Sequence, residues 1–233
     1  ARLAVYYVKN ADPDGSVLLF TPDFPLVVYP HSYKKLDYDP LRDFVAAAAL
    51  SRSNLVMSVG PAVPESVRSI ADFVQWAKNN PKGAFFATTG AGATPHFAGV
   101  MLARAAGIEL TAIHYKGGGP SIQDLIGGQV PLSVNPASEA QGPANAKKIR
   151  VIATTGAERS KFFPDVPTMI ESGYKDVVVS GYTGFFMPAK TPPQTVARFN
   201  SIVAGLLSSE EMRQSLAKLG TEAFAATQEE FGQ

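Results

Sequence analysis

The sequence predicts an α/β protein with mainly parallel sheets, organised as two lobes. Short apolar runs rich in β-branched and aromatic residues alternate with segments of helical period, the pattern of strands connected by helices. The chain has 233 residues, which suits two lobes of about 100–120 residues each. Gly and Pro interrupt the chain at Ser58–Pro64 and Gly184–Pro188, where we expect it to cross between lobes. The expected lobes are residues 1–59 with 184–233, and residues 60–183. Two surface loops on a single domain are the alternative.

The expected strands are the short apolar runs between turn signals. In chain order they are Val17–Thr21, Asn54–Val59, Ala84–Thr88, Leu110–His114, Val130–Asn135, Arg150–Thr154 and Val177–Met187.

Helices are expected where start and stop signals flank a helical period. Ser69 and Asp72 form a capping-box-like start to a helix that ends before Pro81. A second helix runs over Pro95–Ala106 and ends at Gly107. Pro192–Pro193 opens a long helix. Its expected apolar stripe consists of Val196, Phe199, Ile202, Val203 and Leu206.

Both ends of the sequence resemble interrupted helices. Ala1–Asn10 has the pattern of a helix end, without a start signal before it. Thr227 has the pattern of an N-cap, followed by acidic residues but by no helix body. We therefore expect the first lobe to be incomplete at both termini, so that the absence of a leader carries no information.

The composition excludes several classes of function. Hydrophobic residues make up 45% and charged residues 18%, typical of a globular chain, and no apolar run approaches the roughly 18 residues of a membrane span. The formal net charge of +1, with scattered basic residues, gives no basic surface for nucleic acid. The absence of cysteine excludes disulfides, thiolate nucleophiles and zinc–thiolate sites.

Three loops between a strand and a helix are candidate binding elements. Thr88–Pro95 (TTGAGATP) brings hydroxyls and backbone N–H groups to a helix start, where the helix dipole favours anions. Tyr115–Pro120 (YKGGGP) feeds a short helix through Gln123–Leu125, and its glycines permit close backbone approach. Thr21–Pro25 follows the first strand in the same way. For any single loop, ordinary turn chemistry is the favoured interpretation, but three such loops together favour binding, because open α/β sheets bind ligands where their strands end.

Enzyme motifs are incomplete. Gly90 and Gly92 match the start of a dinucleotide fingerprint, but Pro95 replaces the third glycine. Two S-x-x-K matches, beginning at Ser32 and Ser215, lack the partner motifs of acyl enzymes. The three histidines lack metal-ligand spacing, although His96 opens the anion-loop helix. We expect no catalytic residues, no metal and no cofactor.

Seven segments form one set in order along the whole chain: Pro13–Gly15 with Leu18–Leu19, Tyr29–Phe44, Thr89–His96, Tyr115–Pro120, Asp124–Val130, Pro164–Thr168 and Pro188–Pro192. In these segments the sequence resembles a known family, the Bug-type extracytoplasmic receptors of tripartite tricarboxylate transporters.

The resemblance implies a two-lobed, venus-flytrap receptor in the periplasm. It would bind a small carboxylate, delivering it to membrane subunits of a secondary transporter without being membrane-embedded itself. The implied ligand-binding residues are Thr21, Pro22 and Asp23 on the first lobe; Thr89, Gly90, Ala91, Gly92, Ala93, Thr94 and His96 on the second; and Lys116, Gly117, Gly118, Gly119, Pro120, Asn135 and, near the hinge, Tyr182.

The sequence also departs from that family. Its members begin with a strand and a Pro-Gly-Gly loop that has no counterpart here, and Asp23 stands where a small or hydroxyl residue is expected. Two other functions remain open. One is a transferase-like enzyme that uses the glycine-rich loop for a phosphate, and the other is a ligand-sensing module that docks on a signalling partner.

Overall fold

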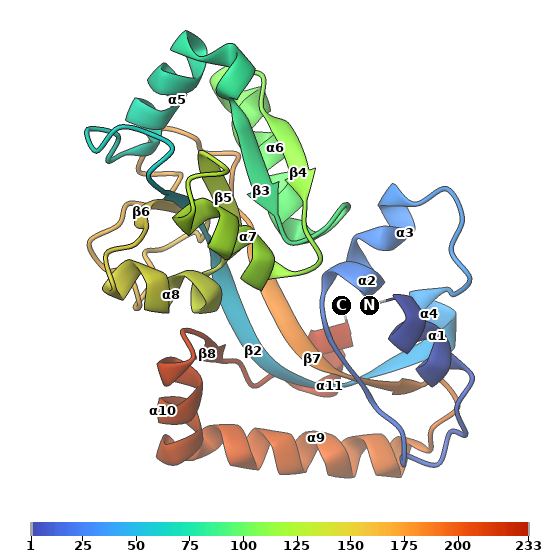
Figure 1. Cartoon of the computed structure of the whole chain (residues 1–233). Coiled ribbons are helices and arrows are strands. Elements are labelled where there is room, and N and C mark those ends of the chain that lie inside the picture. The colour runs from blue at the N-terminus through green and yellow to red at the C-terminus, as the bar shows by residue number, and fades with distance from the viewer. Residues whose placement is uncertain (1, 233) are drawn as a thin grey trace. The chain divides into compact units, whose positions relative to one another are not determined.

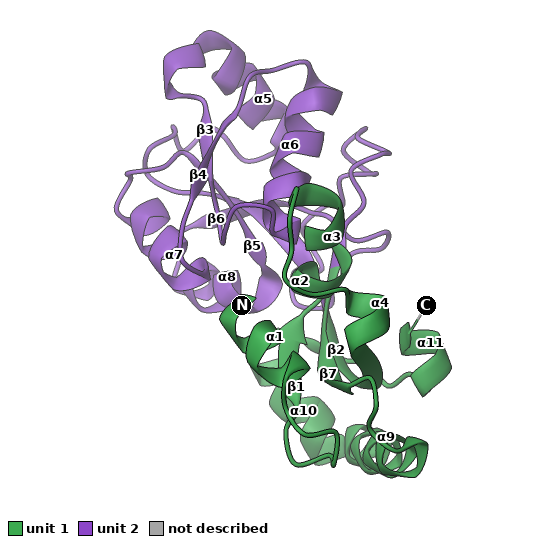
Figure 2. Cartoon of the chain, turned by 90° about the vertical axis from the view of Figure 1, so that its right-hand side faces the viewer, with its two compact units in different colours: residues 1–52, 181–233 green, residues 53–180 purple. Residues whose placement is uncertain are grey.

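The computed structural model describes residues 2–232, which form two compact units (Figure 2). Unit 1 combines the chain up to Arg52 with the chain from Gly181 onward, and unit 2 spans Ser53–Ser180. The chain therefore passes between the units inside strand β2 (Phe44–Val59) and at the start of strand β7 (Ser180–Pro188) (Figure 1).

Of the two Gly-Pro segments that we expected to join the lobes, Ser58–Pro64 lies in unit 2 and Gly184–Pro188 lies in unit 1. A Cβ on Gly60 would lie 2.1 Å from the carbonyl oxygen of Leu125, within unit 2. A Cβ on Gly184 would lie 2.8 Å from the carbonyl oxygen of Ala48, within unit 1. Both glycines therefore permit close packing inside a unit.

The sheet of unit 2 contains both parallel and antiparallel strands. Strand β3 (Phe85–Thr88) is parallel to β4 (Thr111–His114) and to β5 (Leu132–Pro136). The end of β2 pairs antiparallel with β5 and with β6 (Arg150–Thr154). Since β5 and β6 are both antiparallel to β2, the strands β3, β4, β5 and β6 run in one direction and β2 runs against them. A mainly parallel strand direction, as predicted, thus holds in this sheet, whereas the strand pairs of unit 1 described below are antiparallel.

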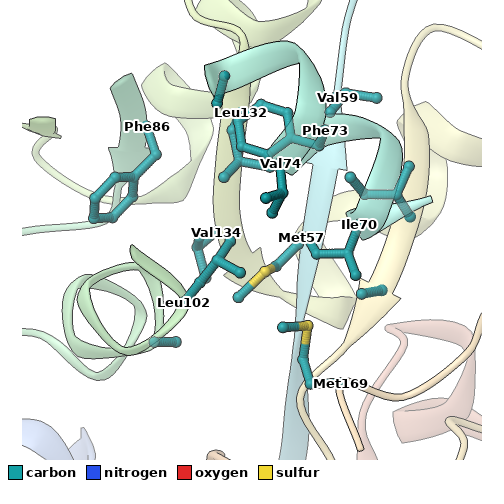
Figure 3. Packing of buried hydrophobic residues seen from close by; sticks show 14 of the residues in the cluster. Met57, Val59, Ile70, Phe73, Val74, Phe86, Leu102, Leu132, Val134 and Met169 are labelled. Atoms are coloured by element: carbon teal, nitrogen blue, oxygen red, sulfur yellow. The ribbon is translucent and has the colours of Figure 1, made fainter. Parts of the chain in front are cut away.

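Helices cover both faces of this sheet. On one face, α5 (Ile70–Asn79) and α6 (Thr94–Ala106) pack over the side chains of Met57, Phe86 and Val134 (Figure 3). On the other face, α7 (Gly118–Ile126) and α8 (Ala137–Asn145) contribute Ile122, Leu125 and Ala140 to a second cluster. A 3₁₀ turn, η1 (Pro81–Gly83), connects α5 to β3.

The expected helix signals operate as predicted in α5 and α6. Ser69 and Asp72 form a capping box at the start of α5, in which each side chain accepts a hydrogen bond from the other residue's backbone N–H. Gly107 ends α6 with φ +61°, in the left-handed region that favours glycine.

Unit 1 surrounds the other halves of the long strands. Strand β1 (Leu19–Pro22) pairs antiparallel with β7, and β8 (Glu222–Ala223) pairs with β2. The helices of unit 1 are α1 (Arg2–Lys9), α2 (Phe24–Val27), α3 (Tyr29–Ser32), α4 (Pro40–Asp43), α9 (Pro193–Ser208), α10 (Glu210–Lys218) and α11 (Gln228–Gly232).

Unit 1 differs from the sequence-based predictions in three details. The buried side of α9 contains Val196, Val203 and Leu207, whereas Ile202 and Leu206 are each 52% exposed, so the expected apolar stripe was wrong at these two positions. Thr21 and Pro22 still belong to β1, so the strand continues into the expected loop. Of the expected N-terminal helix, Ala1 lies outside the described residues and the remainder forms α1.

Candidate functional site

Three parallel strands of unit 2 end at one side of their sheet. Each is followed by a helix: β3 by α6, β4 by α7 and β5 by α8. We call the ends of these strands, with the segments up to the first turn of each helix, the carboxyl edge. The first N–H groups of a helix lack intrahelical acceptors, and its dipole is positive at that end. The carboxyl edge therefore collects three helix starts.

Backbone hydrogen bonds hold the first two loops of the carboxyl edge together. The N–H of Tyr115 donates to the carbonyl of Thr88 over 2.9 Å, and the N–H of Gly117 donates to that of Thr89 over 2.9 Å. The loop after β3 and the loop after β4 thus extend the parallel pairing of their strands.

The loop after β3 is fixed by a side chain of the helix that follows it. Gly92 has φ +72°, and its N–H donates to Nδ1 of His96 over 3.2 Å. The N-cap of α6 is Ala93, which has no capping side chain. Within the first turn of α6, Pro95 has no N–H and the N–H of His96 donates to the carbonyl of Ala93 over 2.9 Å, so it is chiefly the positive end of the helix dipole that favours an anion here.

His96 is held in a neutral, accepting state. Its ring stacks on Phe86, with centroids 6.4 Å apart, and lies edge-on to His114 at 4.7 Å. Burial lowers the pKa of His96 below its ordinary value of 6.5, and the neighbouring His114 lowers it further. An unprotonated Nδ1 is what the hydrogen bond from Gly92 requires.

Thr88, the last residue of β3, contributes a buried hydroxyl. Its side chain is fully buried, and Oγ1 has no hydrogen-bond partner among the described residues. Strand alternation puts it on the same sheet face as Phe86, whose ring lies against Gly99 of α6. A donor is therefore available beneath the start of α6, where leaving it unpaired costs about 1–3 kcal/mol.

The loop after β4 contains a glycine with positive φ and is joined to α7 by a side-chain hydrogen bond. Gly117 has φ +102° and is the N-cap of α7, and the adjacent Lys116 is exposed. The hydroxyl of Tyr115 donates to the carboxylate of Asp124 over 2.7 Å. Burial and this hydrogen bond raise the pKa of Tyr115 to about 12. This hydrogen bond between Tyr115 and Asp124, which we call the brace, fixes the loop on α7. Lys116 adds a positive charge to the loop.

Asn135, near the end of β5, is the centre of a polar network. Its side chain is fully buried, and Nδ2 donates to Oγ of Ser121 over 2.9 Å and to Oε2 of Glu139 over 2.8 Å. Its Oδ1 accepts a hydrogen bond from the hydroxyl of Ser133. The network joins β5 to the first turns of α7 and α8.

Glu139 brings a carboxyl group against the start of α7. A Cβ on Gly118 would lie 1.7 Å from Oε2 of Glu139, so only glycine leaves room for this carboxyl group. Burial raises the pKa of Glu139 above its ordinary value of 4.5, whereas the hydrogen bond from Asn135 acts in the opposite direction.

The structure divides the expected site residues between the two units. The carboxyl edge of unit 2 holds Thr89–Thr94, His96, Lys116–Pro120 and Asn135. Unit 1 holds Thr21–Asp23 and Tyr182, and the N–H of Asp23 donates to the carbonyl of Tyr182 over 2.9 Å.

Within unit 1, Asp23 and Tyr182 have defined surroundings. Asp23 is the N-cap residue of α2, but its side chain makes no capping hydrogen bond. The ring of Tyr182 is 40% exposed and lies 5.6 Å from that of Phe224. Tyr182 thus presents part of its ring to solvent.

Four polar residues of the carboxyl edge were not among the predicted site residues. Thr88 was noted only as the start of its loop, and Ser121, Ser133 and Glu139 were not noted at all. The segment Asn135–Glu139 (NPASE) carries a usable signal, because Pro and an early acidic residue are typical of a helix start after a strand.

The described residues contain neither a cluster of metal-ligating side chains nor a membrane-spanning helix. Among residues 2–232, no group of three or more His, Cys, Asp or Glu side chains could hold a metal ion. No helix within the same range combines the length and apolar character needed to cross a membrane.

Curated relatives cover most of this chain. A UPF0065 protein encoded in the tcbD-tcbE intergenic region of Pseudomonas sp. strain P51 is 30% identical over 214 residues, covering 91% of this chain and 63% of the relative. A UPF0065 protein of Agrobacterium vitis is 29% identical, covering 92% of this chain and 61% of the relative. Protein BugT of Bordetella pertussis is 26% identical over 94% of this chain and 67% of its own length. The chain thus spans about three fifths of the first two relatives.

Solved structures share the fold of this chain. R. palustris Rpa4515 with adipate has a TM-score of 0.93 at 27% identity, covering 98% of this chain and 76% of its own. The periplasmic binding protein BugD has a TM-score of 0.87 at 28% identity, covering 96% and 74%. MatC from Rhodopseudomonas palustris with bound malate has a TM-score of 0.85 at 26% identity, covering 95% and 74%. These neighbours confirm the predicted periplasmic-binding-protein fold.

A family model agrees with both sets of similarities. The model described as the tripartite tricarboxylate transporter family receptor, TctC, matches residues 2–233. This chain therefore belongs to the tripartite tricarboxylate transporter receptor family, as its sequence motifs predicted.

Proposed function

We propose that this protein is a periplasmic receptor that binds a small carboxylate and passes it unchanged to the membrane subunits of a tripartite transporter. The observation that carries this proposal is the convergence of three helix starts at the carboxyl edge of unit 2. Such helix starts stabilise negative charge through their N–H groups and dipoles.

The individual side chains suit a carboxylate. The buried hydroxyl of Thr88 is a donor, the dipole of α6 is positive at its start, and Lys116 supplies a positive charge. Family members of similar fold support the same ligand class, since one is described with adipate and another with bound malate. The roles of Asp23 and Tyr182 in unit 1 remain predictions from the sequence.

The side chains give less support to catalysis. Nδ1 of His96 already accepts the hydrogen bond from Gly92. The described contacts of His96 include no nucleophile. Nucleophilic catalysis requires a nucleophile and a base within hydrogen-bond reach. We therefore propose binding without chemical change of the ligand.

Thermal-shift screening tests the proposal. The protein is mixed with a panel of organic acids including adipate, malate, succinate and aspartate, and hits are measured by calorimetry. A ligand at 100 times its Kd stabilises a protein by about 2.7 kcal/mol, which is easily detected. The ligand is then recovered and identified by mass spectrometry. An absence of hits, or recovery of a chemically changed acid, would overturn the proposal.

A further inference from the structure

The carboxyl group of Glu139 is an unusual feature of a site proposed to bind anions. It lies in the first turn of α8, is half-buried, and reaches the start of α7 at Gly118. A negative group here repels a ligand carboxylate placed nearby, since two unit charges 4 Å apart interact by about 4 kcal/mol at an effective dielectric constant of 20. Some feature of the ligand or the protein must therefore offset it.

The protein itself offsets the charge only in part. Nδ2 of Asn135 donates to Oε2 of Glu139, whereas Oε1 receives no hydrogen bond from any described residue. None of the ion pairs in the described part of the chain includes Glu139. A half-buried carboxyl group with one neutral donor leaves acceptor capacity unused.

Glu139 lies within the carboxyl edge, beside the start of α7. Its contact residue Gly118 directly follows Gly117, whose N–H donates to the carbonyl of Thr89 in the loop after β3. The chain of contacts from Glu139 through Gly117 to Thr89 thus joins the carboxyl group to the loop that is proposed to bind the ligand carboxylate.

The alternative is that Glu139 only fixes the starts of α7 and α8. Its contacts with Asn135 and Gly118 would then be its whole role. That alternative predicts that replacing the carboxyl group lowers stability and affects all ligands alike, whereas a recognition role predicts a change in ligand preference.

We propose, on the basis of the proposed function, that Glu139 is a specificity-determining residue that accepts a hydrogen bond from an ammonium or hydroxyl donor of the ligand. The preferred ligand class is then a small carboxylate with such a donor, an amino acid or a hydroxy acid, rather than a plain dicarboxylate. Charge-assisted hydrogen bonds to a carboxylate are about twice as strong as neutral ones.

Three ligands that differ at a single substituent provide the test. Aspartate, malate and succinate share four carbons and two carboxylates but carry an ammonium, a hydroxyl and a hydrogen at the second carbon. Their affinities are measured by calorimetry for the unaltered protein and for Glu139→Gln, which keeps the shape of the side chain. Glu109→Gln is the matched control, because Glu109 is exposed and precedes β4, at the opposite end of that strand from the carboxyl edge.

The proposal predicts a change in preference rather than a uniform loss. The unaltered protein binds aspartate or malate at least tenfold, or about 1.4 kcal/mol, more tightly than succinate. Glu139→Gln loses most of this difference and binds succinate as well as before or better, and Glu109→Gln retains it. Far-UV circular dichroism and melting temperature establish that each variant is folded.

Two negative results would distinguish a wrong role for Glu139 from a wrong proposed function. If organic acids bind but Glu139→Gln changes the affinity for all three ligands equally, or leaves the preference intact, Glu139 is not a specificity residue and the proposed function stands. If no acid in the wider panel binds the unaltered protein, the proposed function itself fails.

Discussion

The backbone N–H of Gly92 donates to Nδ1 of His96, four residues further along the chain. This bond ties the loop after β3 to the first turn of α6, so the shape of the loop depends on an unprotonated ring. The residue that positions this loop is thus also the residue whose protonation would release it.

Acidification is therefore expected to destabilise the fold through His96. Because burial and His114 lower the pKa of His96, the unfolded chain takes up a proton at a higher pH than the folded chain does. The free energy of unfolding should decrease as the pH falls through about 6.5, the ordinary histidine value. Denaturant unfolding at pH 7.5 and pH 5.5 measures this change. His96→Asn should reduce the difference between the two, whereas His31→Asn, at an exposed position, should not. An equal difference in His96→Asn would contradict the assignment.

Gly118→Ala should destabilise the protein by about 1–3 kcal/mol, as expected for overpacking. The reason is that the new Cβ would lie 1.7 Å from Oε2 of Glu139. Adding Glu139→Ala to this variant should recover part of the loss, giving a clear coupling energy in a double-mutant cycle of unfolding free energies.

Gly205→Ala, within α9, is the control for this cycle, because a Cβ there meets no atom within 4 Å and no proline follows it. In a helix this change should be neutral or stabilising by up to about 1 kcal/mol. Equal effects of the two alanine substitutions would show that the contact with Glu139 is unimportant.

Ser69→Ala should lower the free energy of unfolding by about 1 kcal/mol, because it removes half of the capping box of α5. Hydrogen bonds from the backbone of Arg68 and from Ser69 hold the pKa of Asp72 below its ordinary value of 3.8. The stabilisation from Asp72 is therefore present above pH 3.8 and is lost as the pH falls further. Chemical unfolding at pH 7 and pH 3 tests both statements. Ser66→Ala, at an exposed position three residues earlier, should change stability by less than about 0.5 kcal/mol.

Tyr115→Phe should cost about 1–2 kcal/mol, because it leaves the carboxylate of Asp124 without its 2.7 Å hydrogen bond from the tyrosine hydroxyl. The loop between β4 and α7 should also become more mobile, which amide hydrogen exchange at Lys116–Gly118 would detect. Tyr174→Phe is the matched control, since the Tyr174 hydroxyl takes part in no described hydrogen bond and its pKa is raised by burial alone. Similar losses in both variants would argue against the brace.

Local signals predicted much of unit 2. The helices α5 and α6 were expected from Ser69, Pro95 and Gly107, because caps and breakers act over a few residues. The two glycine-rich loops of the carboxyl edge were found for the same reason. Local chemistry thus identified the backbone elements of the candidate site.

Non-local packing decided what the sequence did not reveal. The first half of β2 contains the run Ala46–Ala49, and alanine favours helices, yet the strand is imposed by burial of Ala47, Ala48 and Ala49. The helix α8 was not expected because Gly142 and Pro143 interrupt its pattern. Since α8 was missed, Glu139 was missed with it. Its contact with Gly118 depends on how α7 and α8 pack, which no short-range pattern records.

The division of unit 1 between two distant stretches of chain has a consequence for biosynthesis. Unit 2 is continuous and can form all its pairings once Ser180 has been synthesised, whereas Leu19 in β1 must wait for its partner Phe186 in β7. Until then β1 is an unpaired edge, and such edges invite association with other chains. The strand pairing of unit 2 can thus be complete before that of unit 1.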